Sequence, residues 1–242
     1  MSKKKTPSGW LSFNAPCCIH NGENADRRKR GGIMNSPDGT LSFHCFNCGF
    51  KTSYTPGRKI SLKTKGGILQ AESKGDNLVK INMGQPNFDW KKIPLSKEID
   101  NKNLKIKIKS LDGKEILGGF SLSIGNPHVV FFVEDCGQFN LNKIGPAIEN
   151  HSYFPEKCNV TLATVKNKKH IIVKVWERGA GLTKACGTAA CATAVSGASL
   201  KFTERCVDIE FPEGLLNIDW NMNNNIYMTG KVSSVKKITV NI

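Results

Sequence analysis

The sequence predicts an α+β protein in which a small, metal-stabilised N-terminal unit precedes a larger domain made mainly of β-strands. Three observations lead to this class. Cysteine and histidine pairs with metal-ligand spacing lie within the first 57 residues. From residue 59 onward, apolar and polar residues alternate in many short segments, which is typical of half-buried strands. A run of small residues after Cys186 predicts one helix that is buried on all sides.

Charge is distributed unevenly along the 242 residues. The net charge is +15, and residues 1–66 alone carry 12 Lys+Arg against 3 Asp+Glu. This basic end indicates an acidic partner and favours nucleic acid, with a merely solubilising tail as the alternative. No apolar run is long enough to span a membrane, and no secretory signal follows the N-terminal lysines. Nine cysteines, an odd number, suit the reducing cytoplasm, which is the expected location.

Two short cysteine and histidine pairs predict a zinc site in residues 1–57. Cys17 and His20 are spaced Cys-x-x-His, and Cys45 and Cys48 are spaced Cys-x-x-Cys. Each pair can place two ligands on one tight turn, and four ligands complete a tetrahedral site with no open position. We therefore expect one structural zinc ion, whose binding provides folding energy to a unit with little core. Cys18 and His44 adjoin these ligands, with less suitable spacing.

The segment between the two pairs has features of a single-stranded nucleic-acid binder. A basic run precedes two expected strands, at residues 32–34 and 41–44, which a turn at residues 36–39 joins. Basic groups contact phosphates and aromatic faces stack on bases, although about half of the aromatics are expected in the core. The basic residues are Arg27, Arg28, Lys29 and Arg30, and the aromatic residues are Trp10, Phe43, Phe46, Phe50 and Tyr54.

The same segment resembles the zinc ribbon of DNA primases. Cys-x-x-His is followed by His-Cys-Phe-x-Cys-Gly, and the phrases RKRGGIM and FHCFNCGFKTSYTPGR are most similar to primases of tailed phages. The resemblance implies that residues 1–57 bind single-stranded DNA and do not polymerise it, because no polymerase domain is visible.

Residues 58–111 form the junction and a set of linking strands, residues 112–237 a lobe, and residues 238–242 a tail. The KIKIK stretch predicts a half-buried strand, with a nucleic-acid-binding arm as the alternative. Residues 141–151 predict a short helix. The remaining strands are expected within residues 60–64, 78–83, 118–133, 159–165, 170–177, 206–211, 215–220 and 226–232.

Cys186 stands at the start of the expected buried helix. Unpaired N–H groups and the positive end of the helix dipole favour a thiolate, so we expect a lowered thiol pKa. The N–H groups of Gly187 and Thr188 could hold a carboxylate at the same place. A reactive thiol beside a bound acid indicates proton transfer at an acidic carbon, or thiol attack. The alternative is an inert, buried cysteine.

Ordered motifs around Cys186 resemble the C-terminal half of the diaminopimelate epimerase family, over about residues 59–237. They are TKGGILQAE, INMGQPNFDWKKIPL, GNPHVVFFVED, ENHSYFPEKCNV, WERGAG followed by ACGTAACA, FPEGLLNIDW and IYMTGKV. The resemblance implies a lobe in which a curved mixed β-sheet wraps around a central α-helix. It also implies isomerisation of LL- and meso-diaminopimelate in lysine biosynthesis by cysteine acid/base chemistry, with no cofactor for that step.

Inverting a stereocentre requires two acid–base groups on opposite faces of the carbon. By the resemblance, Cys186 is the second of the family's two cysteines, and Gly187 and Thr188 bind the α-carboxylate. Glu177 and Arg178 would bind and orient the amino-acid head group, and Asn126 and Asn159 would contact the substrate. From the residues alone, Glu177 and Arg178 could equally be a surface ion pair, and the asparagines could serve turn formation.

One departure from the family pattern is large. The family's first lobe carries its cysteine in Cys-Gly-Asn-Gly, and this sequence has no such motif. Cys48–Gly49 matches only the first two residues of that motif, and Cys48 is already an expected zinc ligand. We therefore expect a half-site, weak or inactive alone, whose uncovered face promotes self-association. The alternative is a zinc-ribbon protein that binds single-stranded DNA and carries an inert epimerase lobe, or a misassembled gene.

Overall fold

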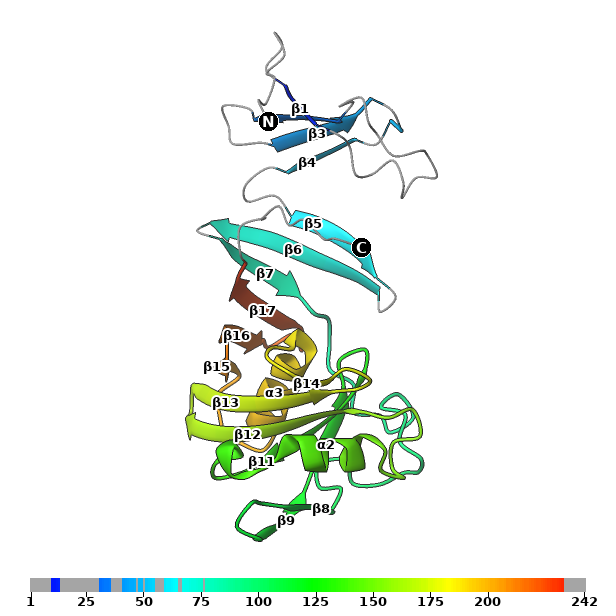
Figure 1. Ribbon diagram of the computed structural model, residues 1–242, viewed down its shortest axis with the longest axis vertical. Helices are drawn as coiled ribbons and strands as arrows, with labels where there is room; N and C mark the ends of the chain where they lie inside the picture. Colours follow the sequence, from blue (N-terminus) through cyan, green and yellow to red (C-terminus); the bar gives the residue numbers. More distant parts are fainter. Residues whose placement is uncertain are drawn as a thin grey trace. The chain divides into compact units, whose positions relative to one another are not determined.

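The computed structural model describes residues 10–13, 31–35, 41–46, 48–49, 51–54, 59–64, 67–75 and 77–232. It divides into two compact units, which are described separately (Figure 1). One unit contains residues 1–59 and 72–76, and the other contains residues 60–71 and 77–242. The predicted zinc ligands Cys17 and His20 and the basic run from Arg27 to Arg30 lie outside the described residues.

The first unit contains a four-stranded sheet in the order β1-β2-β3-β4. Its strands are β1 (Leu11–Phe13), β2 (Gly31–Asn35), β3 (Leu41–Cys45) and β4 (Lys51–Tyr54). The two strands expected at residues 32–34 and 41–44 are confirmed as β2 and β3, which pair antiparallel with Gly32 opposite His44. Cys45, at the end of β3, is fully buried.

The second unit is built on a mixed sheet in the order β10-β11-β12-β13-β15-β16-β17-β7-β6-β5, with β14 paired to β13. Of this sheet, Lys59 in β5 and residues 72–75 in β6 belong to the first unit. Two of its pairings, β11 with β12 and β13 with β15, are parallel. The strands are β5 (Lys59–Thr64), β6 (Gly67–Gly75), β7 (Leu78–Asn82), β10 (Phe120–Ser123), β11 (Pro127–Phe132), β12 (Asn159–Asn167), β13 (His170–Glu177), β14 (Gly181–Thr183), β15 (Cys206–Phe211), β16 (Gly214–Trp220) and β17 (Ile226–Lys231). Most were expected from alternation, whereas β6 and β14 were not.

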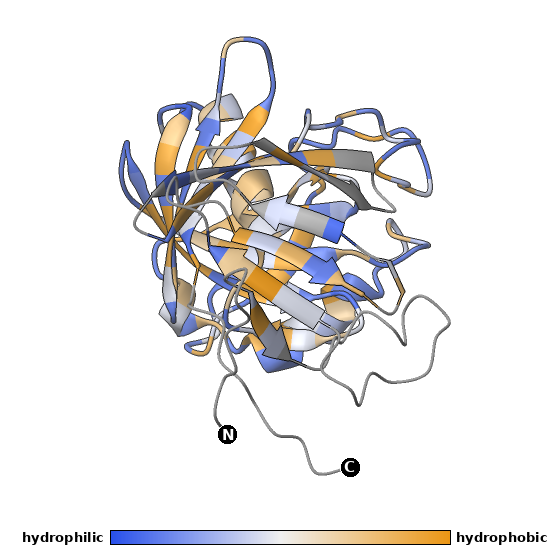
Figure 2. Ribbon diagram, turned by 90° about the horizontal axis from the view of Figure 1, so that it is seen from above, coloured by the Kyte–Doolittle hydropathy of each residue, from blue (hydrophilic) through white to orange (hydrophobic). Residues whose placement is uncertain are grey.

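Helix α3 (Gly187–Ser199) is the centre of this unit, and the expected buried helix is thereby confirmed. Every residue from Ala189 to Gly197 is buried, because the helix contacts β10, β11, β12, β15, β16 and β17. Only alanine, glycine and other small residues allow strands to approach a helix from so many sides. Figure 2 shows the helix enclosed by strands as largely apolar.

Helix α2 (Leu141–Glu149) covers the opposite face of β12 and β13, and confirms the short helix expected at residues 141–151. Val160 and Leu162 of β12 pack in the apolar cluster on the α2 side, whereas Ala163 packs in the cluster around α3. Because both faces of β12 are covered, its first six residues are all buried. The lobe therefore has three layers at this point: α2, the sheet and α3.

A separate hairpin, β8 (Ile106–Lys109) and β9 (Glu115–Gly118), contributes to the α2-side cluster. Its buried isoleucines alternate with exposed lysines, which confirms KIKIK as a half-buried strand. A single-turn helix, η1 (Cys136–Gln138), follows β11. Among the residues that the structure describes, no helix is long and apolar enough to cross a membrane.

Candidate functional site

The thiol of Cys186 lies at the N-terminal end of α3. Cys186 is the N-cap residue, with an extended backbone (φ −150°, ψ 114°), and 8% of its surface is exposed. The first intrahelical bond runs from the Ala190 N–H to the Cys186 carbonyl oxygen, at 3.0 Å. Gly187 and Thr188 occupy the first two helical positions, where backbone N–H groups have no partner within a helix. This is the geometry expected for holding a carboxylate.

A chain of hydrogen bonds leads from the buried core to this thiol. The Nε2 of His128 lies 3.0 Å from Asn126 Oδ1, and Asn126 Nδ2 donates to Thr188 Oγ1 at 3.4 Å. Thr188 Oγ1 is in turn 3.5 Å from Cys186 Sγ. With His128 neutral and donating from Nε2, every donor along the chain points toward Cys186. The Thr188 hydroxyl can therefore donate to the sulfur.

The pKa of Cys186 is raised, which corrects the lowered value that its place at a helix N-terminus predicted. Burial of the thiol is the largest cause, because desolvation disfavours the thiolate. Thr188 and the Ala189 N–H act in the opposite direction, whereas the nearby Glu177 carboxylate adds to the rise. Desolvation outweighs the helix terminus, so at neutral pH Cys186 is a thiol that can donate a proton.

The other predicted binding residues gather at the end of β13 and beside it. Glu177 ends β13 and is half-buried, while Arg178 begins the turn to β14 and is exposed. Asn159, at the start of β12, accepts from the Arg178 N–H at 3.0 Å and donates to the Pro127 carbonyl at 2.9 Å. Asn159 thereby joins the turn to β11, which carries His128 and which Asn126 directly precedes.

A buried glutamate beneath this turn was not among the predicted site residues. Glu149, the last residue of α2, has 6% of its surface exposed. Its carboxylate accepts from Trp176 Nε1 at 2.7 Å and from the Gly179 N–H at 3.1 Å. The sequence signal was a carboxylate at the end of an amphipathic helix, next to a motif already assigned to the site. His128 was also missed, although its GNPH motif was recognised.

His128 predicts an acid-dependent loss of stability. Burial, with a smaller contribution from Arg178, lowers the pKa of His128 to about 3. Between pH 6.5 and 3 the unfolded chain binds a proton there and the folded chain does not, so the free energy of unfolding falls as pH decreases. The expected slope is about 1.4 kcal/mol per pH unit. Urea unfolding at pH 7, 6, 5 and 4 measures it.

His128→Gln is the matched variant, because its amide can still donate to Asn126 but does not titrate. It is expected to remove this part of the slope between pH 6.5 and 4. Equal slopes for the wild type and the variant would show that His128 has the same pKa in the folded and unfolded states.

Half of the predicted zinc site lies within the described residues. Cys45 Sγ accepts from the Cys48 N–H at 3.5 Å, and the Gly49 N–H donates to the Cys45 carbonyl at 3.0 Å. Gly49 has φ +72°, which glycine adopts without strain. This tight turn suits two thiolate ligands of one metal ion. The described residues contain no group of three or more metal-ligating side chains.

Comparison with protein families identifies the lobe. The family model for diaminopimelate epimerase matches residues 120–235. A diaminopimelate epimerase of Pelagibacter ubique is 47% identical over 210 residues, which cover 85% of this chain and 77% of that protein. The Bartonella quintana enzyme is 39% identical over 224 residues. These aligned residues make up 90% of this chain and 77% of that enzyme. A Rhodopseudomonas palustris enzyme is 43% identical over 174 residues, only 59% of its length.

The alignment with the Pelagibacter enzyme includes 85% of this chain, which is more residues than the segment from Lys59 to Ile242 contains. It therefore includes residues before Lys59, within the segment where the sequence predicted a primase-like unit.

Solved structures agree in fold at low identity. The lobe architecture resembles a PhzF-family protein of Bacillus anthracis, with a TM-score of 0.52 and 14% identity over 87% of this chain and 83% of the other. It also resembles a hydroxyproline epimerase of Agrobacterium vitis, with a TM-score of 0.51 and 13% identity over 94% of this chain and 74% of the other. These likenesses establish the fold alone. Because the identity and coverage of the Pelagibacter and Bartonella enzymes are high, the chain belongs to the diaminopimelate epimerase family.

Proposed function

We propose that the Cys186 end of α3 is a half-site for diaminopimelate, which moves a proton at the α-carbon of the substrate without a cofactor. One observation carries the proposal: a largely buried thiol at a helix N-terminus lies 3.5 Å from the Thr188 hydroxyl, and the Glu177 carboxylate acts to raise the pKa of this thiol. Proton transfer at a carbon next to a carboxylate requires an acid–base group, here the thiol, close to a position that binds the carboxylate.

Each residue has a chemical task in this proposal. The N–H groups of Gly187 and Thr188 bind the α-carboxylate, and Glu177 and Arg178 orient the amino-acid head group. Asn126 contacts the substrate from the bend that precedes β11. The thiolate fraction of Cys186 removes the α-proton to form the α-carbanion, and the resulting thiol exchanges its proton with solvent and returns one to the same face of that carbon. The thiolate is stabilised by the Thr188 hydroxyl and the Ala189 N–H, the two contacts that lower the pKa of Cys186.

Inversion requires a second acid–base group on the other face of the α-carbon. The 242 residues contain no Cys-Gly-Asn-Gly motif. Among the described cysteines, Cys191 lies further along α3 in the core, and Cys206 lies exposed on β15 with Asn217 as its neighbour. The half-site is therefore expected to exchange the α-proton with retention of configuration and to invert it much more slowly.

Two rates measured on one sample test this proposal. Purified chain is incubated with LL-diaminopimelate in heavy water, loss of the α-proton signal is followed by NMR, and the meso isomer is quantified by chiral chromatography. The expected result is deuterium incorporation with little meso product. Inversion as fast as exchange would overturn the half-site, and absence of both exchange and binding would overturn the proposed function.

A second candidate function, single-stranded DNA binding through a zinc-stabilised first unit, is favoured by a cavity of about 440 Å³ on the first sheet. Trp10, Phe43, His44 and Lys51 line it together with Met34, Ser42 and Ser53. Phe46 is 60% exposed, and its ring lies 4.0 Å from that of His44. Aromatic faces beside a lysine can stack on bases and contact phosphates. The Cys45–Cys48 turn supports a structural zinc ion in the same unit.

Zinc content and DNA binding test this second function together. The purified chain is expected to contain about one zinc ion per molecule. It is also expected to bind a fluorescent oligothymidine with an affinity that falls steeply as salt increases. Cys45→Ala is expected to abolish both zinc content and DNA binding, whereas Cys186→Ser is expected to change neither. DNA binding that survives removal of zinc would contradict this function.

A further inference from the structure

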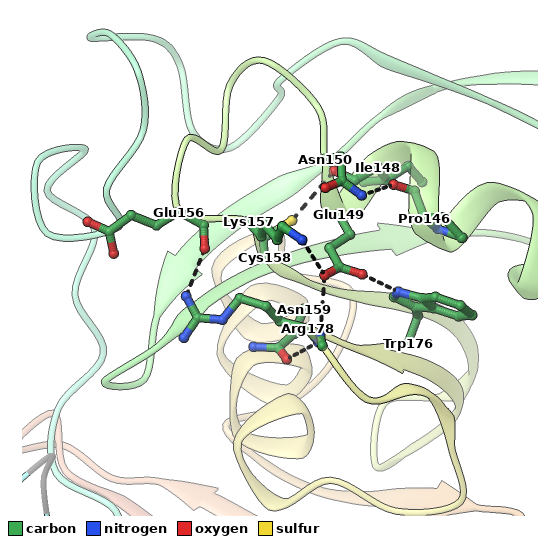
Figure 3. A network of polar contacts seen from close by, with 11 residues as sticks. Pro146, Ile148, Glu149, Asn150, Glu156, Lys157, Cys158, Asn159, Trp176 and Arg178 are labelled. Atoms are coloured by element: carbon green, nitrogen blue, oxygen red, sulfur yellow. Dashed lines mark hydrogen bonds and ion pairs between the residues drawn. The ribbon is translucent and has the colours of Figure 1, made fainter.

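Glu149 lies between the two flanks of the turn that carries the predicted head-group residues. Trp176 precedes Glu177, and Gly179 follows Arg178. The Trp176 Nε1 donates to Glu149 Oε2 at 2.7 Å, and the Gly179 N–H donates to Glu149 Oε1 at 3.1 Å (Figure 3). One carboxylate therefore binds both ends of the four-residue segment that contains Glu177 and Arg178.

The turn also joins two paired strands, because Glu177 of β13 lies opposite Gly181 of β14. The Ala180 N–H donates to the Glu177 carbonyl at 3.0 Å, and Gly179 has φ +75°. Arg178 is fixed from the side, because its N–H donates to Asn159 and its Nη1 donates to the Glu156 carbonyl at 2.9 Å. The backbone of the turn therefore sets the direction of the Glu177 and Arg178 side chains.

Helix α2 holds Glu149 and Trp176 in place. A Cβ on Gly145 would lie 2.6 Å from Trp176 Cγ, so the indole lies directly against the backbone of α2 one turn before Glu149. Lys157 Nζ lies 3.9 Å from Glu149 Oε1 and balances part of the charge. A carboxylate with only 6% exposure keeps both oxygens occupied, because an unsatisfied buried charge is costly.

We infer that Glu149 is a positioning residue, which fixes Glu177 and Arg178 in the orientation that binds the amino-acid head group and places the Glu177 carboxylate beside Cys186. This inference rests on the proposed function, because it assigns Glu149 to the same site. Glu149 does not touch the substrate and acts only through the turn. Its role therefore predicts changes at Cys186 and in ligand binding, beyond any change in stability.

Glu149→Gln tests the role with almost no change in volume. Trp176 and Gly179 both donate N–H groups to Glu149, and glutamine offers them one acceptor and one donor. The amide group must then face either the indole or the Gly179 N–H, and that end of the turn is released. The expected results are a dissociation constant for diaminopimelate raised about tenfold or more, measured by calorimetry, and a changed environment at Cys186.

The pH profile of Cys186 alkylation reports that environment without any ligand. Iodoacetamide labelling is followed on the Cys186 peptide by mass spectrometry. Glu177 raises the pKa of Cys186, so release of Glu177 is expected to shift the midpoint of the profile to lower pH. A purely structural role for Glu149 would not move this midpoint in folded protein.

Glu204→Gln is the matched control. Glu204 also pairs with a lysine, Lys169 at 3.6 Å, but its side chain is 52% exposed. This variant is expected to change neither the dissociation constant nor the alkylation midpoint. If Glu149→Gln does not fold, Trp176→Phe removes the indole donor together with part of the ring that packs on α2, and is expected to shift the midpoint in the same direction by less.

The outcomes separate the two proposals. If the wild type fails to bind diaminopimelate, the proposed function fails, and the midpoint alone decides the role of Glu149. A shift to lower pH in Glu149→Gln or Trp176→Phe supports positioning. An unchanged midpoint in every folded variant overturns it, whatever the affinity for diaminopimelate.

Discussion

Replacing Cys186 with serine is expected to reduce α-proton exchange of diaminopimelate by about a thousandfold or more. A serine hydroxyl is a far weaker acid than a thiol, and its alkoxide is not stabilised enough by Thr188 and Ala189 to form at neutral pH. The residual hydrogen bonds keep the carboxylate site intact, so binding of diaminopimelate is expected to remain. Exchange is measured by NMR in heavy water and binding by calorimetry, at equal protein concentration.

Cys206→Ser is the control for this substitution. Cys206 is exposed on β15, and its Sγ accepts from Asn217 Nδ2 at 3.8 Å. Its replacement is expected to leave the exchange rate unchanged within twofold. If Cys186→Ser retains a tenth of the wild-type rate, the thiol is not the acid–base group, and proton transfer must be assigned to another residue near α3.

Replacing Ala190 with leucine is expected to destabilise the lobe by about 3 kcal/mol or more. Ala190 is fully buried in α3, which strands enclose. Three additional carbon atoms have no space there, so either the helix or the strands must move. Because Cys186 is the N-cap of the same helix, the displaced helix is also expected to lose α-proton exchange. Urea unfolding followed by tryptophan fluorescence measures the change in stability.

The same substitution at Ala198 gives a matched comparison. Ala198 lies in the last turn of α3 and is only partly buried. A leucine there is expected to cost less than about 1 kcal/mol and to leave exchange intact. Equal losses at the two positions would mean that helix propensity, rather than crowding in the core, governs the stability of α3.

Much of this architecture was predictable because its local patterns agree with its packing. Alternation gave β7, β8, β12 and β13, and the run of small residues gave α3 with its N-terminus at Cys186. Strand β6 was missed because its glycines and charged residues obscure the alternation. Strand β14 is only three residues long, so it carries too little pattern to be recognised.

The local structure around Cys186 was predictable, whereas the energetics of its thiol were not. The sequence placed a thiol at a helix N-terminus, but the pKa of that thiol depends on competition between burial and the helix terminus. Burial is a property of the folded environment, so its larger effect could not be read from the motif. The contacts of Glu149 could not be predicted for the same reason. They form only when α2 packs against β13 and brings Glu149 to the turn after Trp176.

The pairing of β7 with β17 determines when the lobe can be completed during synthesis. Leu78 pairs with Lys231 and Asn82 with Tyr227, so most of the lobe lies in the chain between these partners. Ordering so large an intervening loop is entropically slow, and contacts of such sequence separation are associated with slow folding. While the ribosome is still making residues before β17, β7 and β16 each present an open hydrogen-bonding edge. A nascent chain in this state is expected to depend on chaperones until β17 emerges.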